Sequence, residues 1–190
     1  MKPHQAILDV AYELYRRHGL PGLSMRRIAK RVDVTATALY RHFDDKAALL
    51  DAIAERGFAL FAADLRRGNP APGPERRALQ VLERYREFAN GQPHLFRLMF
   101  GEPRPGLRRF PEDFAAHRSP VFDVLRGAVE SAQRAGRIGS ASSLEISLDL
   151  WALAHGLLML RAAGRFTGGE RAFAALYRRS LRRFLGGLAP

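Results

Sequence analysis

The chain has 190 residues, of which 47% are hydrophobic, so it can bury a sizeable core and wholesale disorder is excluded. It contains no cysteine, which excludes disulfides, thiolate metal sites and thiol nucleophiles. The chain has 31 Lys and Arg residues and 19 Asp and Glu residues, and the resulting net charge of +12 favours polyanions or anionic membranes as partners.

The sequence shows neither a signal peptide nor a membrane-spanning segment. Asp9 and Glu13 interrupt the first apolar stretch, which a secretory signal would not tolerate. No run reaches the ~18 consecutive apolar residues that a spanning helix requires. We therefore expect a soluble, cytoplasmic protein without a membrane partner.

Apolar residues recur with a period near 3.6 along almost the whole chain, which predicts an all-α fold of about nine helices. The first helix is expected to end at Gly19. Ser24 and Thr35 are favourable N-cap residues for two short helices that follow, and the second of these is expected to end near Phe43. Asp44 or Asp45 is expected to cap a fourth, longer helix that reaches about Arg67.

Breaker residues separate the later helices. A Pro/Gly-rich break at 68–74 precedes a helix over about 75–90 and a short apolar segment ending at Phe100. A long helical pattern from Glu112 to Arg137 contains Pro120, which predicts a kink or a split. Two more helices are expected, over about 144–163 and 170–185. The predicted organisation is an N-terminal part over 1–46, a connecting helix over 47–67 and a C-terminal part over 68–190.

The segment from Ser24 to Phe43 has the layout of a helix-turn-helix, in which the second helix presents its N-terminal half to the major groove. Eight basic and three acidic residues lie between Arg16 and Lys46, which suits a phosphate backbone. Hydroxyl, aromatic and guanidinium side chains are suited to reading base edges and contacting phosphates. The residues expected to contact DNA are Arg26, Arg27, Thr35, Ala36, Thr37, Tyr40, Arg41, His42 and Lys46.

Residues 24–50, SMRRIAKRVDVTATALYRHFDDKAALL, resemble the DNA-binding domain of the TetR (tetracycline repressor) family of transcriptional regulators, and the likeness covers about residues 5–66. The resemblance implies a repressor that binds a pseudo-palindromic operator as a homodimer and responds to a small-molecule effector. It makes residues 1–46 the expected DNA-binding domain and residues 68–190 the expected regulatory and dimerisation domain. It also implies that Tyr40 and Lys46 contact phosphates. The family often has Gly where Asp33 stands, although Asp tolerates a left-handed turn better than most residues.

The segment WALAHGLLML, residues 151–160, resembles a subgroup of that family marked by Trp followed by His-Gly. Trp151 and His155 share one helical stripe and offer two polar points on an apolar face, which suits a largely apolar ligand. The alternative is that His155 and the cluster before Gly101 are ordinary core residues. The candidate ligand-binding residues are Phe96, Met99, Phe100, Trp151, His155 and Met159.

The last two helices are the candidate dimer interface. The helix over 144–163 is apolar on nearly all sides, which is typical of a central helix or an oligomer contact. Two such helices from each subunit would form a four-helix contact about a two-fold axis. The candidate interface residues are Leu148, Leu157, Phe173, Tyr177, Leu181 and Phe184.

Catalysis finds no support in the sequence. No two histidines have metal-binding helical spacing, and neither a Gly-rich phosphate loop nor a G-x-S-x-G motif is present. We therefore expect no enzymatic activity, no cofactor and no metal. The alternative function is that of a basic nucleic-acid-binding protein without sequence preference or effector response, which would not need the large apolar C-terminal part.

Overall fold

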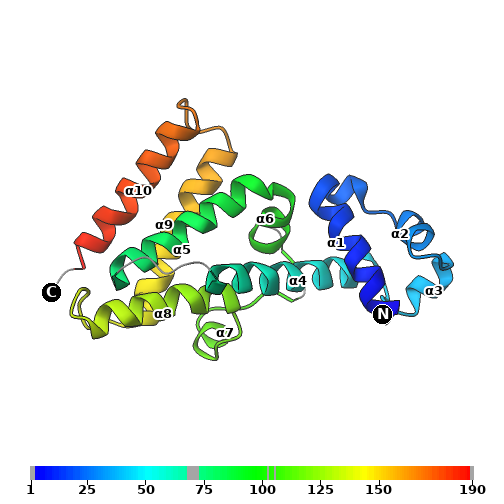
Figure 1. Cartoon of the computed structure of the whole chain (residues 1–190), viewed down its shortest axis with the longest axis horizontal. Helices are drawn as coiled ribbons and strands as arrows, with labels where there is room; N and C mark the ends of the chain where they lie inside the picture. The colour runs from blue at the N-terminus through cyan, green and yellow to red at the C-terminus, as the bar shows by residue number, and fades with distance from the viewer. Residues whose placement is uncertain (1–2, 68–72, 102, 105, 189–190) are drawn as a thin grey trace. The chain divides into compact units, whose positions relative to one another are not determined.

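The computed structural model describes residues 3–67, 73–101, 103–104 and 106–188, except for the side chains of Ala36, Pro74 and Glu75. Within these residues the fold is entirely helical, as predicted, with ten helices (Figure 1). They are α1 (Pro3–Gly22), α2 (Met25–Arg31), α3 (Ala36–Tyr40), α4 (Lys46–Arg67), α5 (Pro74–Gly91), α6 (Pro93–Phe100), α7 (Glu112–Ala115), α8 (Pro120–Arg134), α9 (Ser143–Ala162) and α10 (Glu170–Gly186).

The helices group into two compact units. Unit 1 consists of Met1–Phe61 and Asn90–Leu107, and unit 2 consists of Ala62–Ala89 and Arg108–Pro190. Helix α4 is continuous; it begins in unit 1 and its last turns belong to unit 2. The domain boundaries after residues 46 and 67 stay predictions, and the predicted break at 68–74 lies largely outside the described residues.

In unit 1, α6 packs against α1 and α4 through two glycines. Gly19 has a positive φ of 61°, which ends the regular part of α1 where the sequence predicted. A Cβ atom at Gly19 would lie 2.7 Å from the His94 ring, and one at Gly57 would lie 2.6 Å from the Met99 sulfur. Side chains at these two positions would therefore push α6 away from its neighbours.

The segment after α6 is fixed to α4 by a buried arginine. The Arg104 side chain is 6% exposed and pairs with Asp51 at 2.7 Å and with Glu55 at 3.3 Å. Its guanidinium also lies over the Phe58 ring, and the Gly106 N–H donates to Asp51. Two carboxylates one turn apart on α4 thus hold this segment of unit 1 in place.

Unit 2 contains the predicted split at Pro120. Pro120 is the first residue of α8, where its missing N–H leaves no helical hydrogen bond unmade. His117 has a positive φ of 56° between α7 and α8, which breaks the helical path. The pattern from Glu112 to Arg137 is therefore two helices rather than one.

Helix α9 packs against α8 and α10, but much of its apolar surface is left uncovered. Its mean hydropathy reaches 1.3 over 18 residues, of which 28% are buried. Among the described helices, it is the one long and apolar enough to cross a membrane by length and composition, a property that it shares with core helices of soluble proteins. Met159 and Leu160 are 41% and 49% exposed.

Candidate functional site

Helices α2 and α3 form a helix-turn-helix in unit 1, and both predicted N-caps are confirmed. The Ser24 hydroxyl accepts a hydrogen bond from the Arg27 N–H at 3.5 Å, and the Thr35 hydroxyl accepts one from the Ala38 N–H at 3.1 Å. Ile28 on α2 and Leu39 on α3 have no exposed surface. The two helices are in contact, so these buried side chains set the angle at which α3 is presented.

The turn between the two helices requires a left-handed residue. Asp33 has φ 54°, and the N–H of Val34 donates back to the carbonyl oxygen of Ala29 at 3.0 Å. Glycine adopts this conformation without strain, and aspartate is among the few other residues that tolerate it. Aspartate at position 33 is therefore compatible with the turn.

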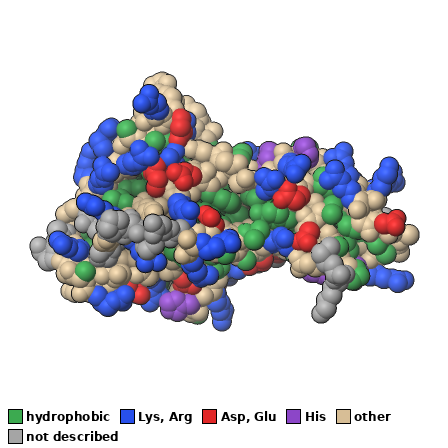
Figure 2. Space-filling model, in the orientation of Figure 1, with side chains coloured by type: hydrophobic (Ala, Val, Ile, Leu, Met, Phe, Trp, Pro, Cys, Tyr) green, Lys and Arg blue, Asp and Glu red, His purple; other side chains and the backbone are tan. Residues whose placement is uncertain are grey.

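The predicted DNA-contacting side chains that the structure describes all lie at the surface. They belong to Arg26, Arg27, Thr35, Thr37, Tyr40, Arg41, His42 and Lys46. Tyr40 is 50% exposed, although tyrosine side chains are on average more buried than this. Lys and Arg side chains project at the end of unit 1 that carries α2 and α3 (Figure 2). Ala36 begins α3, but its side chain lies outside the described part.

Helix α3 is shorter than the sequence predicted. It ends at Tyr40, because the N–H groups of Arg41 and His42 bond carbonyl groups three residues back and tighten the chain into a turn. Phe43, expected as the end of the helix, lies beyond it; its side chain is buried and stacks on the His4 ring, with 4.7 Å between ring centroids. Arg41 and His42 therefore project from a turn and not from the helix.

Lys46 is the exposed first residue of α4. The Asp45 carboxylate caps this helix by accepting a hydrogen bond from the Ala48 N–H at 2.7 Å, as the sequence predicted. The ammonium group of Lys46 therefore stands beside the positive end of the α4 dipole. A phosphate at this position would be attracted by both.

The candidate ligand residues of α6 are packed inside unit 1. Met99 is 1% exposed and Phe96 is 7% exposed, while Phe100 is half-buried. The Phe100 ring lies 5.2 Å from the rings of both Phe96 and Phe58, measured between centroids. These residues thus link α6 directly to α4, which agrees with the alternative that they are core residues.

The candidate ligand residues of α9 form a hydrogen-bonded group in unit 2 with a residue that the sequence did not single out. The buried hydroxyl of Tyr85 on α5 accepts a hydrogen bond from Trp151 Nε1 at 3.1 Å and lies 2.9 Å from His155 Nδ1. A neutral imidazole can accept a hydrogen bond from the Tyr85 hydroxyl through Nδ1, so all three groups are satisfied together. The only signal for Tyr85 in the sequence is that a polar hydroxyl lies on the apolar face of the α5 helix.

An aromatic cluster surrounds this group. Phe114 and Phe122 lie 4.8 Å apart in an edge-to-face arrangement, and each ring is about 6 Å from the Trp151 ring. Trp151 and His155 are half-buried and Met159 is exposed. Because the α6 residues belong to unit 1 and these to unit 2, a pocket formed by both sets stays a prediction.

Burial lowers the pKa of His155 below its ordinary value of 6.5. The unfolded chain therefore binds a proton more readily than the folded chain, and the free energy of unfolding should fall as the pH drops below about 6.5. We expect His155→Gln to make the free energy of unfolding less dependent on pH between pH 7.5 and 5, as measured by urea denaturation.

Replacing Tyr85 with phenylalanine is the matched test of the hydrogen-bonded group. It should lower the free energy of unfolding by about 1–3 kcal/mol at pH 7.5, because two half-buried partners lose their hydrogen bond to the hydroxyl. Exposed His18, which has no contact with this group, provides the control through His18→Gln. An unchanged stability of Tyr85→Phe would contradict the assigned geometry.

Three of the residues predicted for the dimer interface are core residues of unit 2. Phe173, Tyr177 and Leu181 are at most 2% exposed, and the Tyr177 hydroxyl donates to the carbonyl oxygen of Leu82 on α5 at 2.8 Å. They cannot contact a second copy of the chain, because this face of α10 is buried inside its own subunit. The other three predicted interface residues, Leu148, Leu157 and Phe184, are half-buried.

Two family models match the chain. The model described as "Bacterial regulatory proteins, tetR family" matches residues 7–53. The model described as "Tetracyclin repressor-like, C-terminal domain" matches residues 78–184, which is more than half of the chain. The first match includes the helix-turn-helix, and the second includes Tyr85, Trp151 and His155.

Individual relatives agree with these matches. The tetracycline repressor protein class C of Escherichia coli is 49% identical over 51 residues, which are 27% of this chain and 23% of that protein. The matches to the first curated relatives span between about a quarter and a third of their length.

The solved structures match over the whole length. A protein of unknown function from Rhodococcus sp. RHA1 is 30% identical, with a TM-score of 0.80 and coverage of 100% of this chain and 97% of that chain. The transcriptional regulator FadR from Bacillus subtilis, solved in complex with stearoyl-CoA, is 15% identical with a TM-score of 0.68. It covers 97% of this chain and 98% of its own, and its likeness concerns the fold alone.

Proposed function

Because the chain belongs to the TetR family of transcriptional regulators, which is non-enzymatic, we propose that it is a cytoplasmic repressor that binds a pseudo-palindromic operator as a homodimer and is released by a small, largely apolar ligand. The observation that carries the proposal is the capped helix-turn-helix, whose predicted DNA-contacting side chains are exposed while its inner side chains are buried. Thr35, Thr37 and Arg41 face the groove in this proposal, and Tyr40 and Lys46 contact phosphates.

The uncovered face of α9 supports the homodimer. Ala152, Met159 and Leu160 are exposed on this helix although they are apolar. A Cβ atom at Gly156, one turn after Ala152, would meet nothing within 4 Å, so the chain's own packing does not require a glycine there. Two small residues spaced by four allow a second helix to approach closely. We therefore place the centre of the interface on α9, with Leu148 and Phe184 at its edges.

The ligand response follows from how α6 is held. Phe100 and Met99 contact α4 at Phe58 and Gly57, and α4 begins with the phosphate-binding Lys46 of this proposal. A ligand that displaced α6 would therefore move α4 and change the separation of the two recognition helices. An operator fixes the half-site spacing, so the displaced form would lose contacts on one side.

The candidate ligand-binding residues of the proposal are Phe96, Met99 and Phe100 in unit 1 and Trp151, His155 and Met159 in unit 2. The bond from Trp151 to Tyr85 supports assignment to the Trp–His–Gly subgroup, since it gives the tryptophan and the histidine a shared polar partner. The complex of the FadR relative with stearoyl-CoA is a precedent in this fold for a ligand with a long apolar part. No cofactor or metal enters the proposal.

The test is selection of bound duplexes from a random pool, followed by anisotropy titration at physiological salt. We expect two-fold symmetric half-sites and an affinity for the selected duplex about 10³-fold or more above that for random DNA. Light scattering should give twice the chain mass of 21.3 kDa. Equal affinity for both duplexes would favour the alternative of a non-specific basic nucleic-acid-binding protein.

A further inference from the structure

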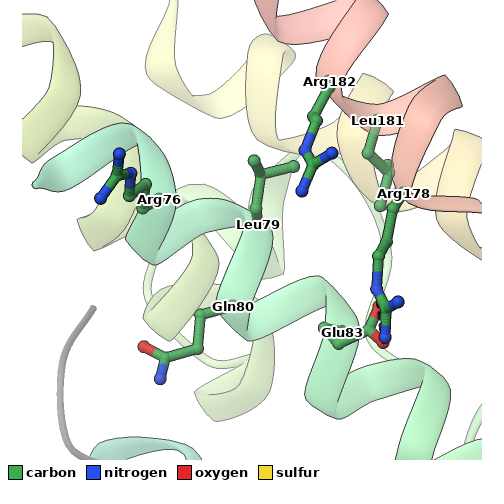
Figure 3. Close-up of a pocket in the computed structure, with 7 residues that line it drawn as sticks. All are labelled: Arg76, Leu79, Gln80, Glu83, Arg178, Leu181 and Arg182. Carbon is green, nitrogen blue, oxygen red and sulfur yellow. Dashed lines mark hydrogen bonds and ion pairs between the residues drawn. The ribbon is translucent and has the colours of Figure 1, made fainter. Parts of the chain in front are cut away.

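Helices α5 and α10 of unit 2 leave an open pocket of about 180 Å³ between them (Figure 3). It is separate from the hydrogen-bonded group of Tyr85, Trp151 and His155. Its lining consists of Arg76, Leu79, Gln80, Glu83, Arg178, Leu181 and Arg182. On α5 the spacing of these residues places them on one helical face, and on α10 they cover one turn.

The pocket carries three guanidinium groups and one carboxylate, and the carboxylate is already engaged. Glu83 accepts hydrogen bonds from Arg86 at 2.7 Å and from Arg178 at 3.1 Å, so it neutralises charge within the protein. Figure 3 shows Arg178 extending along the pocket to Glu83. The positive charge of the other two arginines is therefore not cancelled inside the pocket.

Arg76 and Arg182 are the two groups left for a ligand. Both side chains are exposed, and neither forms an ion pair with a carboxylate among the described residues. Arg182 extends from α10 toward α5 beside Leu79 (Figure 3). A guanidinium presents a planar set of donors that matches a carboxylate or a phosphate with two parallel hydrogen bonds.

The floor of the pocket is apolar. Leu79 and Leu181 line the space between the arginines, but Leu181 is only 1% exposed, so the half-buried Leu79 carries the apolar surface that a ligand can reach. An inorganic ion would leave this floor uncovered, whereas an apolar body attached to an anionic group would cover it. The combination of an apolar floor with polar groups at one side is typical of small-molecule sites.

We propose that the α5–α10 pocket binds a small organic anion, a carboxylate or a phosphate monoester, with a short apolar body. Arg76 and Arg182 hold the anionic group, and Leu79 contacts the body. The pocket lies on the edge of α10 opposite Leu176 and Phe184, so a homodimer formed through α9 and that other edge leaves it open. The site does not depend on the ligand site of the proposed repressor function.

The test uses the full chain and three probes of similar size: benzoate, phenyl phosphate and the neutral benzyl alcohol. Binding is followed by chemical-shift changes on titration. We expect benzoate or phenyl phosphate to bind with a dissociation constant of about 1 mM or tighter, and the stronger of the two identifies the anionic group. Benzyl alcohol should bind at least about tenfold more weakly, because it makes no charge-assisted hydrogen bond.

The paired variants R76Q/R182Q and R77Q/R179Q separate a built site from bulk charge. Each pair removes one exposed arginine from α5 and one from α10, but only the first pair lines the pocket. The first should weaken anion binding about tenfold or more, and the second less than twofold. Equal losses in both pairs, no loss in the first, or equally tight binding of inorganic phosphate would overturn the proposal.

Discussion

Replacing Lys46 with alanine is expected to weaken binding to every duplex by about 10- to 100-fold, because the proposed homodimer would lose two proposed phosphate contacts. Lys46 is exposed at the first position of α4, where the helix dipole adds to its attraction for a phosphate. The loss should be the same for selected and random sequences, since phosphates carry no base identity. The slope of log affinity against log salt should become shallower by about two.

Arg41→Ala is the matched comparison, because Arg41 is also an exposed cation of the helix-turn-helix segment. Its guanidinium is expected to reach a base edge, so the variant should change which operator variants are preferred, at a cost of about 1–3 kcal/mol for the best duplex. Anisotropy titrations over a series of operator variants and salt concentrations measure both effects. A sequence-dependent loss for Lys46→Ala would contradict its assignment to a phosphate.

Replacing Arg86 with methionine is expected to lower the free energy of unfolding by about 2–4 kcal/mol, which is more than we expect for Tyr85→Phe. The Arg86 side chain is 9% exposed and joins Glu83 on its own helix to Glu170 on α10. Burial raises the pKa of Glu83, but hydrogen bonds from Arg86 and Arg178 outweigh burial and hold this pKa below 4.5. Without Arg86, the Glu83 carboxylate stays largely buried but loses the more buried of its two arginine partners.

The pH dependence gives this prediction a second measurement. Because the folded chain holds Glu83 ionised, the stability from this pairing is present above about pH 4.5 and is lost as the pH falls through the lowered pKa. The gap between wild type and Arg86→Met should therefore narrow in acid. Arg178→Met is the control, since Arg178 is 49% exposed and should cost less than about 1 kcal/mol. Equal losses for both variants would contradict the role of burial.

Local signals in the sequence were sufficient for most helices of the fold. Ser24, Thr35 and Asp45 each accept a hydrogen bond from the first turn of the helix that they were expected to cap. Gly19 and Pro120 interrupt the chain where predicted. Such features depend on residues that are neighbours along the chain, so they can be read from spacing alone.

Features that depend on distant residues were not predicted. Periodicity placed Phe173 and Tyr177 on one stripe of a helix, but it does not say whether that stripe faces the same subunit or another. The partner of Trp151 and His155 is Tyr85, which is 66 and 70 residues away in the sequence. Helix α3 ends at Tyr40, and the stacking of Phe43 on His4 joins residues from distant parts of the sequence.

The packing of α6 against α1 and α4 has a consequence for synthesis of the protein. The contacts of His94 with Gly19 and of Met99 with Gly57 join chain segments that leave the ribosome far apart in time. Unit 1 therefore cannot complete its core when residue 61 has been translated, and must wait for residues 90–107. A truncated chain that carries the helix-turn-helix but ends before α6 would expose the α1 and α4 surfaces that α6 covers, which makes it prone to aggregate.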